Sequence, residues 1–455
     1  MKEILQYIDQ NIGGYIEELK EFLRIPSIST LSENQKDINR AAEFVASKLK
    51  SAGMNHVEVI KTEGHPLVYA EWLGAPGKPT VLIYGHYDVQ PVDPIELWNT
   101  PPFEPTIIGD KIFARGATDD KGQMYMHVKS VEAFFKSTGS LPLNVKFLIE
   151  GEEEIGSSSL SSFLKQNADR LKCDAVLISD TSLFAKGVPT LTYGLRGLAY
   201  MELEVVGPNR DLHSGTFGGA VANPINILAS MISKMIDKNG KILIPGFYQD
   251  VLKLSAEERK NFKLLKFSEK TYAKELGVKE LSGEKGYSTL ERTWVRPTLD
   301  CNGIIGGFTE KGAKTVLPSK ATAKISMRLV PYQDPEKIAR LFTKFVKKIA
   351  PKSVKINVTS LHGGSPFVAP ITHPITKAAA RAMEKSFGKK CVFMREGGSI
   401  PIVVEFEKIL KATPVLMGLG LNSENLHSPN EHFDLNHFHL GIVSSANFIK
   451  EFSAV

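Results

Sequence analysis

The stretch NVKFLIEGEEEIGSSSLSSFLKQNADRLKCDAVLISD, residues 144–180, decides the fold class because it alternates strand and helix patterns. Residues 144–151 and 174–180 are short apolar runs that lead into acidic residues, which is typical of buried strands with polar ends. The segment between them, residues 160–168, is expected to be a helix. A strand, a helix and a second strand in succession predict an α/β domain.

The residues before this stretch continue the alternation. Periodicity and apolar runs predict helices over residues 2–24, 36–52 and 122–137 and strands over residues 56–60, 66–73 and 80–89. The sequence therefore predicts an α/β domain with a mostly parallel sheet.

The pattern changes after residue 197. The segments expected there are strands at 198–207, 301–309, 322–331 and 355–361 and helices at 223–236 and 335–349, with an irregular stretch at 244–297. Two β-α-β halves of this kind predict a small α+β domain of ferredoxin-like type. The α/β style resumes after Pro370 with a helix at 375–388 and a strand at 413–420.

Length and composition limit the classes of protein. A chain of 455 residues exceeds the size at which one hydrophobic core keeps growing, so we predict two domains: residues 1–194 with 368–455, and an inserted domain of residues 195–367. The net charge of +6 is spread along the chain, which argues against a nucleic-acid partner. The three cysteines are too scattered for a disulfide framework or a thiolate metal site. Without a membrane-spanning apolar stretch or a signal peptide, we expect a cytoplasmic protein with no membrane partner.

Polar residues stand at the ends of the apolar strands of the larger domain. They are His86 and Asp88 in VLIYGHYD, Asp119 and Asp120 in IFARGATDDKG, the glutamates from Glu150 to Glu154, Asp180 in VLISD, and His427 in NLHSPNEHFD. In an open α/β sheet the carboxyl ends of the strands form the ligand crevice, so we expect these side chains to converge there. Buried without partners, they would be strongly destabilising. Imidazoles and carboxylates without a thiolate suit Zn, Mn or Co, and the surplus of acids indicates two ions.

The sequence resembles the M20 family of metallopeptidases, and within it the carnosinase-like cytosolic dipeptidases. The motifs that carry this resemblance are GHYDVQPVDPIELWNTPPFEP, ARGATDDKGQ, EGEEEIGS, LISD, DLHSGTFGG, AKTVLP, RLVP, REGGSIPI and LHSPNE, in family order from about residue 15 to the C-terminus. The resemblance implies a zinc-peptidase-like catalytic domain with an inserted lid that also forms a homodimer interface.

The resemblance also implies a ligand set for two divalent ions per subunit. His86 and Asp180 would hold one ion, Glu154 and His427 the other, and Asp119 would bridge both. The ions would be Zn or Mn, with Co as an alternative.

Two further residues are implied around these ligands. Glu153 would be the general base that takes a proton from a water between the ions and so leaves a bridging hydroxide, and Asp88 would accept a hydrogen bond from the far nitrogen of His86. The family also carries a cis peptide after its bridging aspartate, here between Asp119 and Asp120. Glu150 and Glu152 have no assigned role.

The lid is implied to supply further residues. His213 in DLHSG would reach the active site of the partner subunit, and Arg328 and Thr315 would hold the C-terminal carboxylate of the substrate. Gly398 and Ser399 stand where the family often has serine and threonine, so only the backbone donors of that loop carry over. His362 is a further candidate for the pocket lining.

These residues predict hydrolysis of a dipeptide or short peptide with a free C-terminal carboxylate. The alternative on the same site is removal of the acyl group from an N-acyl or carbamoyl amino acid. A binding protein without catalysis is disfavoured because all five ligands and Glu153 are present.

Overall fold

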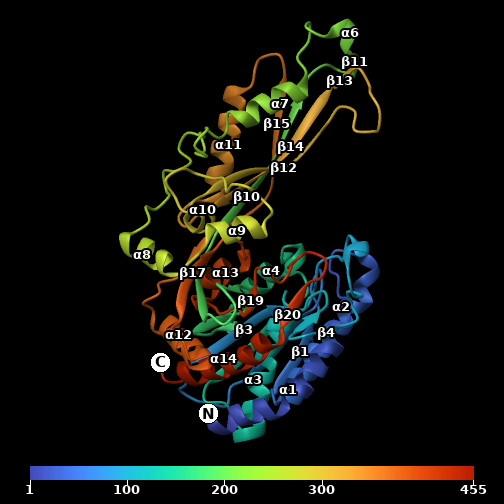
Figure 1. The fold of residues 1–455 in the computed structure, drawn as a ribbon. Helices are drawn as coiled ribbons and strands as arrows, with labels where there is room; N and C mark the ends of the chain where they lie inside the picture. The colour runs from blue at the N-terminus through green and yellow to red at the C-terminus, as the bar shows by residue number, and fades with distance from the viewer. The chain divides into compact units, whose positions relative to one another are not determined.

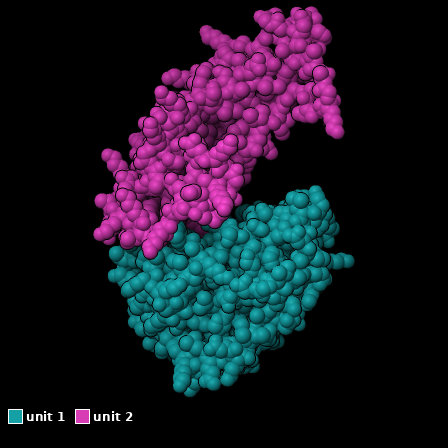
Figure 2. Space-filling model, viewed as in Figure 1, with its two compact units in different colours: residues 1–193, 369–394, 402–455 teal, residues 194–368, 395–401 magenta.

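The computed structural model describes residues 1–455, and the chain divides into two compact units. Unit 1 comprises residues 1–193, 369–394 and 402–455, and unit 2 comprises residues 194–368 and 395–401 (Figure 2). The segment 395–401 is therefore part of unit 2, whereas the sequence prediction assigns it to the catalytic domain.

The sheet of unit 1 is parallel at its centre. Its central strands are, in spatial order, β6 (Asn144–Glu150), β3 (Thr80–His86), β7 (Ala175–Ile178) and β18 (Thr413–Leu416), and they run parallel to one another. Antiparallel strands extend both sides: β2 (Leu67–Trp72) and β1 (His56–Ile60) beyond β6, and β9 (Thr190–Leu195) beyond β18. The predicted α/β class is confirmed, with the parallel character confined to the centre.

Long helices cover one face of this sheet (Figure 1). They are α1 (Lys2–Leu23), α2 (Gln35–Ala52), α3 (Lys121–Thr138), α12 (Pro374–Phe387) and α14 (Leu435–Phe452). Their apolar side chains share a core with residues of the central strands, such as Val81, Ile83 and Phe147. On the other face of the sheet, the ring of Tyr84 packs edge-on against Phe406, with 5.1 Å between centroids.

Helix α14 is the long element that the sequence pattern does not predict. Residues on most sides of this helix are buried. Its sequence therefore lacks the exposed polar stripe by which an amphipathic helix is recognised. Its N-terminus is fixed by Asp434, whose carboxylate accepts hydrogen bonds from the backbone N–H groups of Asn436 and His437.

Unit 2 contains an antiparallel sheet of four strands. Their spatial order is β12 (Thr298–Gly306), β14 (Lys320–Leu329), β10 (Gly197–Val206) and β15 (Lys355–Gly364). Helices α7 (Pro224–Ser233) and α11 (Pro335–Ile349) share a core with one face of this sheet. Alternate residues of β10 and β14 are buried in that core, which leaves the other face open. The chain order β-α-β-β-α-β matches the predicted ferredoxin-like domain.

The stretch 244–297 is more ordered than the sequence prediction expects. It contains three short helices, α8 (Ala256–Leu264), α9 (Glu269–Glu275) and α10 (Thr289–Trp294). Capping boxes of the Ser-X-X-Glu type begin α8 at Ser255 and α10 at Ser288, and both are readable in the sequence. No helix of the structure has the length and apolar character needed to span a membrane.

Candidate metal centre

The parallel strands of unit 1 bring the predicted ligands to one edge of the sheet. Strand β3 ends at His86, and Asp180 follows β7 by two residues. Asp119 lies just before α3, which packs against β3. The ligand atoms form two groups, each within 4.8 Å: His86, Asp119 and Asp180 in one, and Asp119, Glu154 and His427 in the other. Asp119 belongs to both groups.

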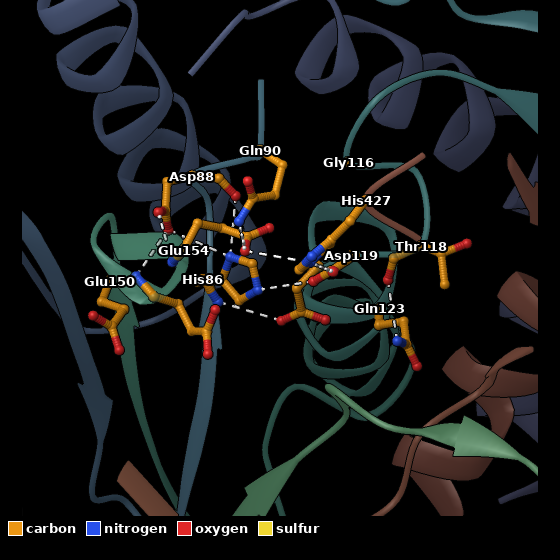
Figure 3. Close-up of polar contacts among 12 residues, drawn as sticks. His86, Asp88, Gln90, Gly116, Thr118, Asp119, Gln123, Glu150, Glu154 and His427 are labelled. Carbon is orange, nitrogen blue, oxygen red and sulfur yellow. Dashed lines mark hydrogen bonds and ion pairs between the residues drawn. The ribbon is translucent and has the colours of Figure 1, made fainter. Parts of the chain in front are cut away.

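The two oxygens of Asp119 face different imidazole rings (Figure 3). Its Oδ1 atom lies 3.2 Å from Nε2 of His86, and its Oδ2 atom lies 2.9 Å from Nε2 of His427. The same His427 nitrogen lies 3.4 Å from Oε2 of Glu154. A carboxylate placed between two sets of ligands in this way can bridge two cations.

His86 is oriented by Asp88, but mainly through the backbone of that residue. Its Nδ1 atom lies 3.0 Å from the carbonyl oxygen of Asp88 and 3.4 Å from Oδ1 of the same residue. The Asp88 carboxylate instead accepts hydrogen bonds from the backbone N–H groups of Glu153 at 3.3 Å and Glu154 at 3.1 Å. We therefore assign the His86 proton to Nδ1, which leaves Nε2 free to act as a ligand.

The peptide bond between Asp119 and Asp120 is cis, as the sequence analysis expects. Asp120 precedes α3, but its side chain caps no N–H group of that helix. Its Oδ2 atom accepts a hydrogen bond of 3.3 Å from the backbone N–H of His86. Asp120 therefore links the loop of one predicted ligand to the strand that carries another.

The loop of His427 has an unusual backbone. His427 has a φ of 56°, and Asn425 and Asn430 on either side of it have φ values of 59° and 64°. Few residues other than glycine adopt this left-handed region, although asparagine and histidine do so more often than most. Such conformations collect at functional sites, where the surrounding contacts hold them in place.

The charges of the five predicted ligands favour the binding of cations. Burial and the charge of Asp119 raise the pKa of Glu154 and Asp180 well above the usual value. The hydrogen bond to Asp119 raises the pKa of His427 to about 9. These two carboxyl groups therefore hold protons to higher pH than isolated ones do, and divalent cations could take the place of those protons. The oxygen and imidazole donors fit Zn²⁺, Mn²⁺ or Co²⁺.

The two glutamates without an assigned role, Glu150 and Glu152, are buried acceptors of hydrogen bonds. Glu152 is buried and accepts hydrogen bonds of 3.0 Å from the backbone N–H groups of His65 and Ser159, so it caps the first turn of α4 (Ser158–Gln166). Glu150 is also buried, accepts hydrogen bonds from Tyr84 and Ser157, and has its pKa raised by burial to about 8.

One supporting residue escapes the sequence analysis although it lies in a quoted motif. The side-chain amide of Gln90 donates a hydrogen bond of 2.7 Å to Oε2 of Glu154, the same oxygen that faces His427 (Figure 3). Gln90 comes two residues after Asp88 in GHYDVQ, and this proximity is the only sequence signal that could have indicated it.

In unit 2, His213 is the last residue of one short strand, and Thr315 directly precedes the strand that pairs with it. Strand β11 (Leu212–His213) pairs with β13 (Val316–Leu317), and the backbone N–H of Ser214 donates to the carbonyl oxygen of Thr315 at 3.0 Å. The His213 ring is exposed, and its Nδ1 accepts a hydrogen bond of 3.1 Å from the backbone N–H of Gly215.

Arg328 and the loop at residues 395–401 also come together in unit 2. The guanidinium of Arg328 donates to Oγ of Ser399 at 2.9 Å, and Ser399 donates to the carbonyl oxygen of Arg196 at 2.6 Å. The carbonyl oxygen of Gly398 accepts a hydrogen bond of 3.1 Å from the backbone N–H of Arg196.

His362, the last of the predicted residues, lies on β15 opposite Tyr200 of β10. The two rings contact each other with 5.0 Å between centroids, and the His362 side chain is exposed. The structure gives it no ionic partner.

In this α/β fold, two groups of candidate metal ligands share one aspartate. This arrangement is typical of a metal-dependent enzyme. The family model for the peptidase family M20/M25/M40 matches residues 82–451. The Cys-Gly metallodipeptidase of Schizosaccharomyces pombe is 33% identical over 470 residues, covering 100% of this chain and 99% of that protein.

Two solved structures are similar over nearly the whole chain. Human carnosine dipeptidase 1 has a TM-score of 0.88 and 32% identity, covering 100% of this chain and 99% of that one. An M20 family metallo-carboxypeptidase from Sulfolobus solfataricus has a TM-score of 0.87 and 35% identity, covering 97% and 99%. The chain therefore belongs to the peptidase family M20/M25/M40 and is a metallopeptidase.

Proposed function

We propose that this enzyme hydrolyses the peptide bond of dipeptides or short peptides with a free C-terminal carboxylate, and that it uses two divalent cations per subunit. The observation that carries the proposal is the pair of ligand groups that share Asp119. Relatives named for Cys-Gly and β-Ala-His hydrolysis support the choice of dipeptides.

His86 and Asp180 would hold one cation, Glu154 and His427 the other, and Asp119 both. Zn²⁺ or Mn²⁺ suits these donors, with Co²⁺ as the alternative. When bound, the cations would supply a water of lowered pKa and polarise the scissile carbonyl.

Glu153 is the proposed general base. Its backbone N–H is held by Asp88, next to that of the ligand Glu154, so the base and the ligand are fixed by one buried carboxylate. Glu153 would take a proton from the attacking water and return it to the leaving amine. Burial raises the pKa of Glu153, and nearby cations would lower it and keep the base ionised.

The substrate carboxylate would be recognised by unit 2. A guanidinium matches a carboxylate in geometry and charge, and Arg328 lies on the open face of the sheet, already hydrogen bonded to Ser399. Thr315, Gly398 and His362 would complete the pocket. His213 would act at the active site of the partner subunit, which requires a homodimer formed through unit 2.

The test combines metal content with two substrate panels. The metal-loaded enzyme is assayed on free dipeptides, including Cys-Gly and β-Ala-His, and on N-acetyl and N-carbamoyl amino acids. We expect two equivalents of metal and a preference for the dipeptides. Preference for the acylated panel would keep the site and assign the alternative reaction.

Glu153→Gln is the matched variant in this test. It removes the base and none of the five proposed ligands, so we expect two equivalents of metal and a loss of turnover of roughly 100- to 10,000-fold. A protein that never binds more than one equivalent would contradict the proposed role of Asp119.

A further inference from the structure

Glu431 lies directly behind the aspartate shared by the two ligand groups. Its side chain is fully buried, and its two oxygens receive four hydrogen bonds. Oε2 accepts from Nη1 of Arg115 at 2.8 Å and from the backbone N–H of Gly116 at 2.9 Å. Oε1 accepts from the backbone N–H groups of Thr118 at 3.0 Å and Asp119 at 3.1 Å.

The loop from Arg115 to Asp119 is thus wrapped around one carboxylate. Gly116 has a φ of 81°, and a Cβ atom there would lie 2.6 Å from a methyl group of Val89, so only glycine permits this path. The loop cannot turn Asp119 without breaking hydrogen bonds to Glu431. The direction of the Asp119 carboxylate therefore depends on Glu431.

Glu431 is also four residues beyond His427 in the chain. It joins the loop that carries His427 to the loop that carries Asp119, and the backbone N–H of Ala114 adds a hydrogen bond of 3.1 Å to the carbonyl oxygen of Glu431. A second link comes from Glu424, which accepts a hydrogen bond of 3.1 Å from the hydroxyl of Thr118. These hydrogen bonds therefore hold the two loops together.

We propose that Glu431 is the positioning residue of the metal centre, which sets the Asp119 carboxylate so that it serves both cations at once. The inference rests on the proposed two-cation function. Glu431 touches no predicted ligand atom, and it acts through the backbone of the Asp119 loop.

Glu431→Gln is a specific test because a carboxylate only accepts hydrogen bonds, whereas an amide replaces one acceptor oxygen with a donating NH₂ group. In either orientation of the glutamine side chain, its NH₂ group faces two of the four groups that donate hydrogen bonds to Glu431. The expected result is a loss of Zn²⁺ affinity at both sites, about 10- to 100-fold, because residues that orient metal ligands have effects of this size.

The measurement is a titration of the chelator-treated, folded protein with Zn²⁺ in competition with a chromophoric chelator. It yields both dissociation constants without reference to activity. Steady-state kinetics at saturating Zn²⁺ provide a second readout, with a lower kcat and an unchanged KM expected. A role limited to folding would lower the melting temperature and leave the Zn²⁺ affinities of the folded protein unchanged.

Glu291→Gln is the matched control. Glu291 is a buried glutamate of unit 2 that accepts hydrogen bonds from the backbone N–H of Ser288 at 2.7 Å and from Nε of Arg259 at 2.6 Å. The substitution disturbs the same kinds of contact in the other unit, so the Zn²⁺ affinities should equal those of the wild type.

If Glu431→Gln does not fold, Arg115→Met takes its place. It removes one of the four donors and leaves the three backbone hydrogen bonds, so we expect a weaker loss of Zn²⁺ affinity of about 3- to 10-fold, again at both sites. Wild-type affinity in a folded Glu431→Gln protein, a loss at one site alone, or wild-type affinity in Arg115→Met after failure of the first variant would overturn the inference. A wild-type protein that binds fewer than two Zn²⁺ ions would overturn the proposed function itself.

Discussion

The candidate metal centre of unit 1 and the predicted substrate residues of unit 2 are built differently. Asp119 and His86 are buried, and hydrogen bonds fix the strand and loops that carry them. In unit 2, His213 and His362 are exposed, and the only side-chain hydrogen bonds of His213 are to its own turn. The metal centre is thus preorganised within one unit, whereas the two histidines of unit 2 have room to adapt to a ligand.

The largest expected effect concerns the shared aspartate. Asp119→Asn removes the negative charge common to both ligand groups, so we expect the loss of both cations and a fall in activity on the order of 1,000-fold or more. Metal analysis after gel filtration checks this. The half-exposed side chain of Asp237 in unit 2 also accepts backbone hydrogen bonds, so Asp237→Asn is the control and should retain both ions. Retention of one tightly bound ion by Asp119→Asn would show that the two groups are independent.

The next effect tests the exposed histidine of unit 2. His213→Ala should lower kcat by roughly 100-fold, the usual cost of one transition-state donor, with the metal content unchanged. His56 in unit 1 is also exposed, and His56→Ala should leave kcat unchanged.

Mixing the chains tells whether His213 acts on its own subunit. When His213→Ala and Glu153→Gln chains exchange at random, half of the dimers are mixed and one of their two sites is intact, so about a quarter of the sites should recover. No recovery after verified exchange would place the histidine in the site of its own chain.

A smaller effect is expected for carboxylate recognition. Arg328→Met removes a charged hydrogen-bond donor, so kcat/KM for dipeptides should fall by about 10- to 100-fold. The metal content should not change. Dipeptide amides, which lack the carboxylate, should be poor substrates of the wild type and should be cleaved equally by the variant. A loss of the same size on the amides would mean that Arg328 supports the fold and not the substrate.

The smallest effect concerns the rigid core of unit 1. His127 is buried between Ser445 and Ser179, and burial lowers its pKa to about 3. Below pH 6.5 the unfolded chain therefore binds a proton at His127 that the folded chain does not. The free energy of unfolding should decrease as the pH decreases. Between pH 7 and pH 5 the wild type should lose about 2 kcal/mol more free energy of unfolding than His127→Gln. Denaturant unfolding at both pH values measures this difference, and equal losses would contradict it.

The two regions also differ in how far the sequence predicts them. The approach of His86 and Asp180 follows from their positions at the ends of parallel strands, and the family motifs add Asp119 and His427. No pattern shows that Glu431 would accept hydrogen bonds from a loop more than 300 residues earlier in the chain, or that the backbone of Asp88 lies closer to His86 than its carboxylate does. Such contacts depend on the packing of distant loops, which periodicity does not describe.

The fold shows the same division. Amphipathic helices such as α1 and α11 are readable because one face is polar, whereas α14 is buried on most sides and carries no such stripe. Of the three short helices within 244–297, α8 and α10 were accessible through their capping boxes, but these helices lack an apolar period long enough to stand out.

The assignment of residues 395–401 to unit 2 has a consequence for protein engineering. Removing residues 194–368 as one block would leave this segment in the remaining polypeptide but take away Arg196, Arg328 and Glu258, which hold Gly398, Ser399 and Arg395. A truncated catalytic unit would then keep a seven-residue stretch that has lost these partners, next to Ile402, which is buried in the intact chain. A stable minimal version therefore requires two excisions, the second replacing residues 395–401 with a short polar linker.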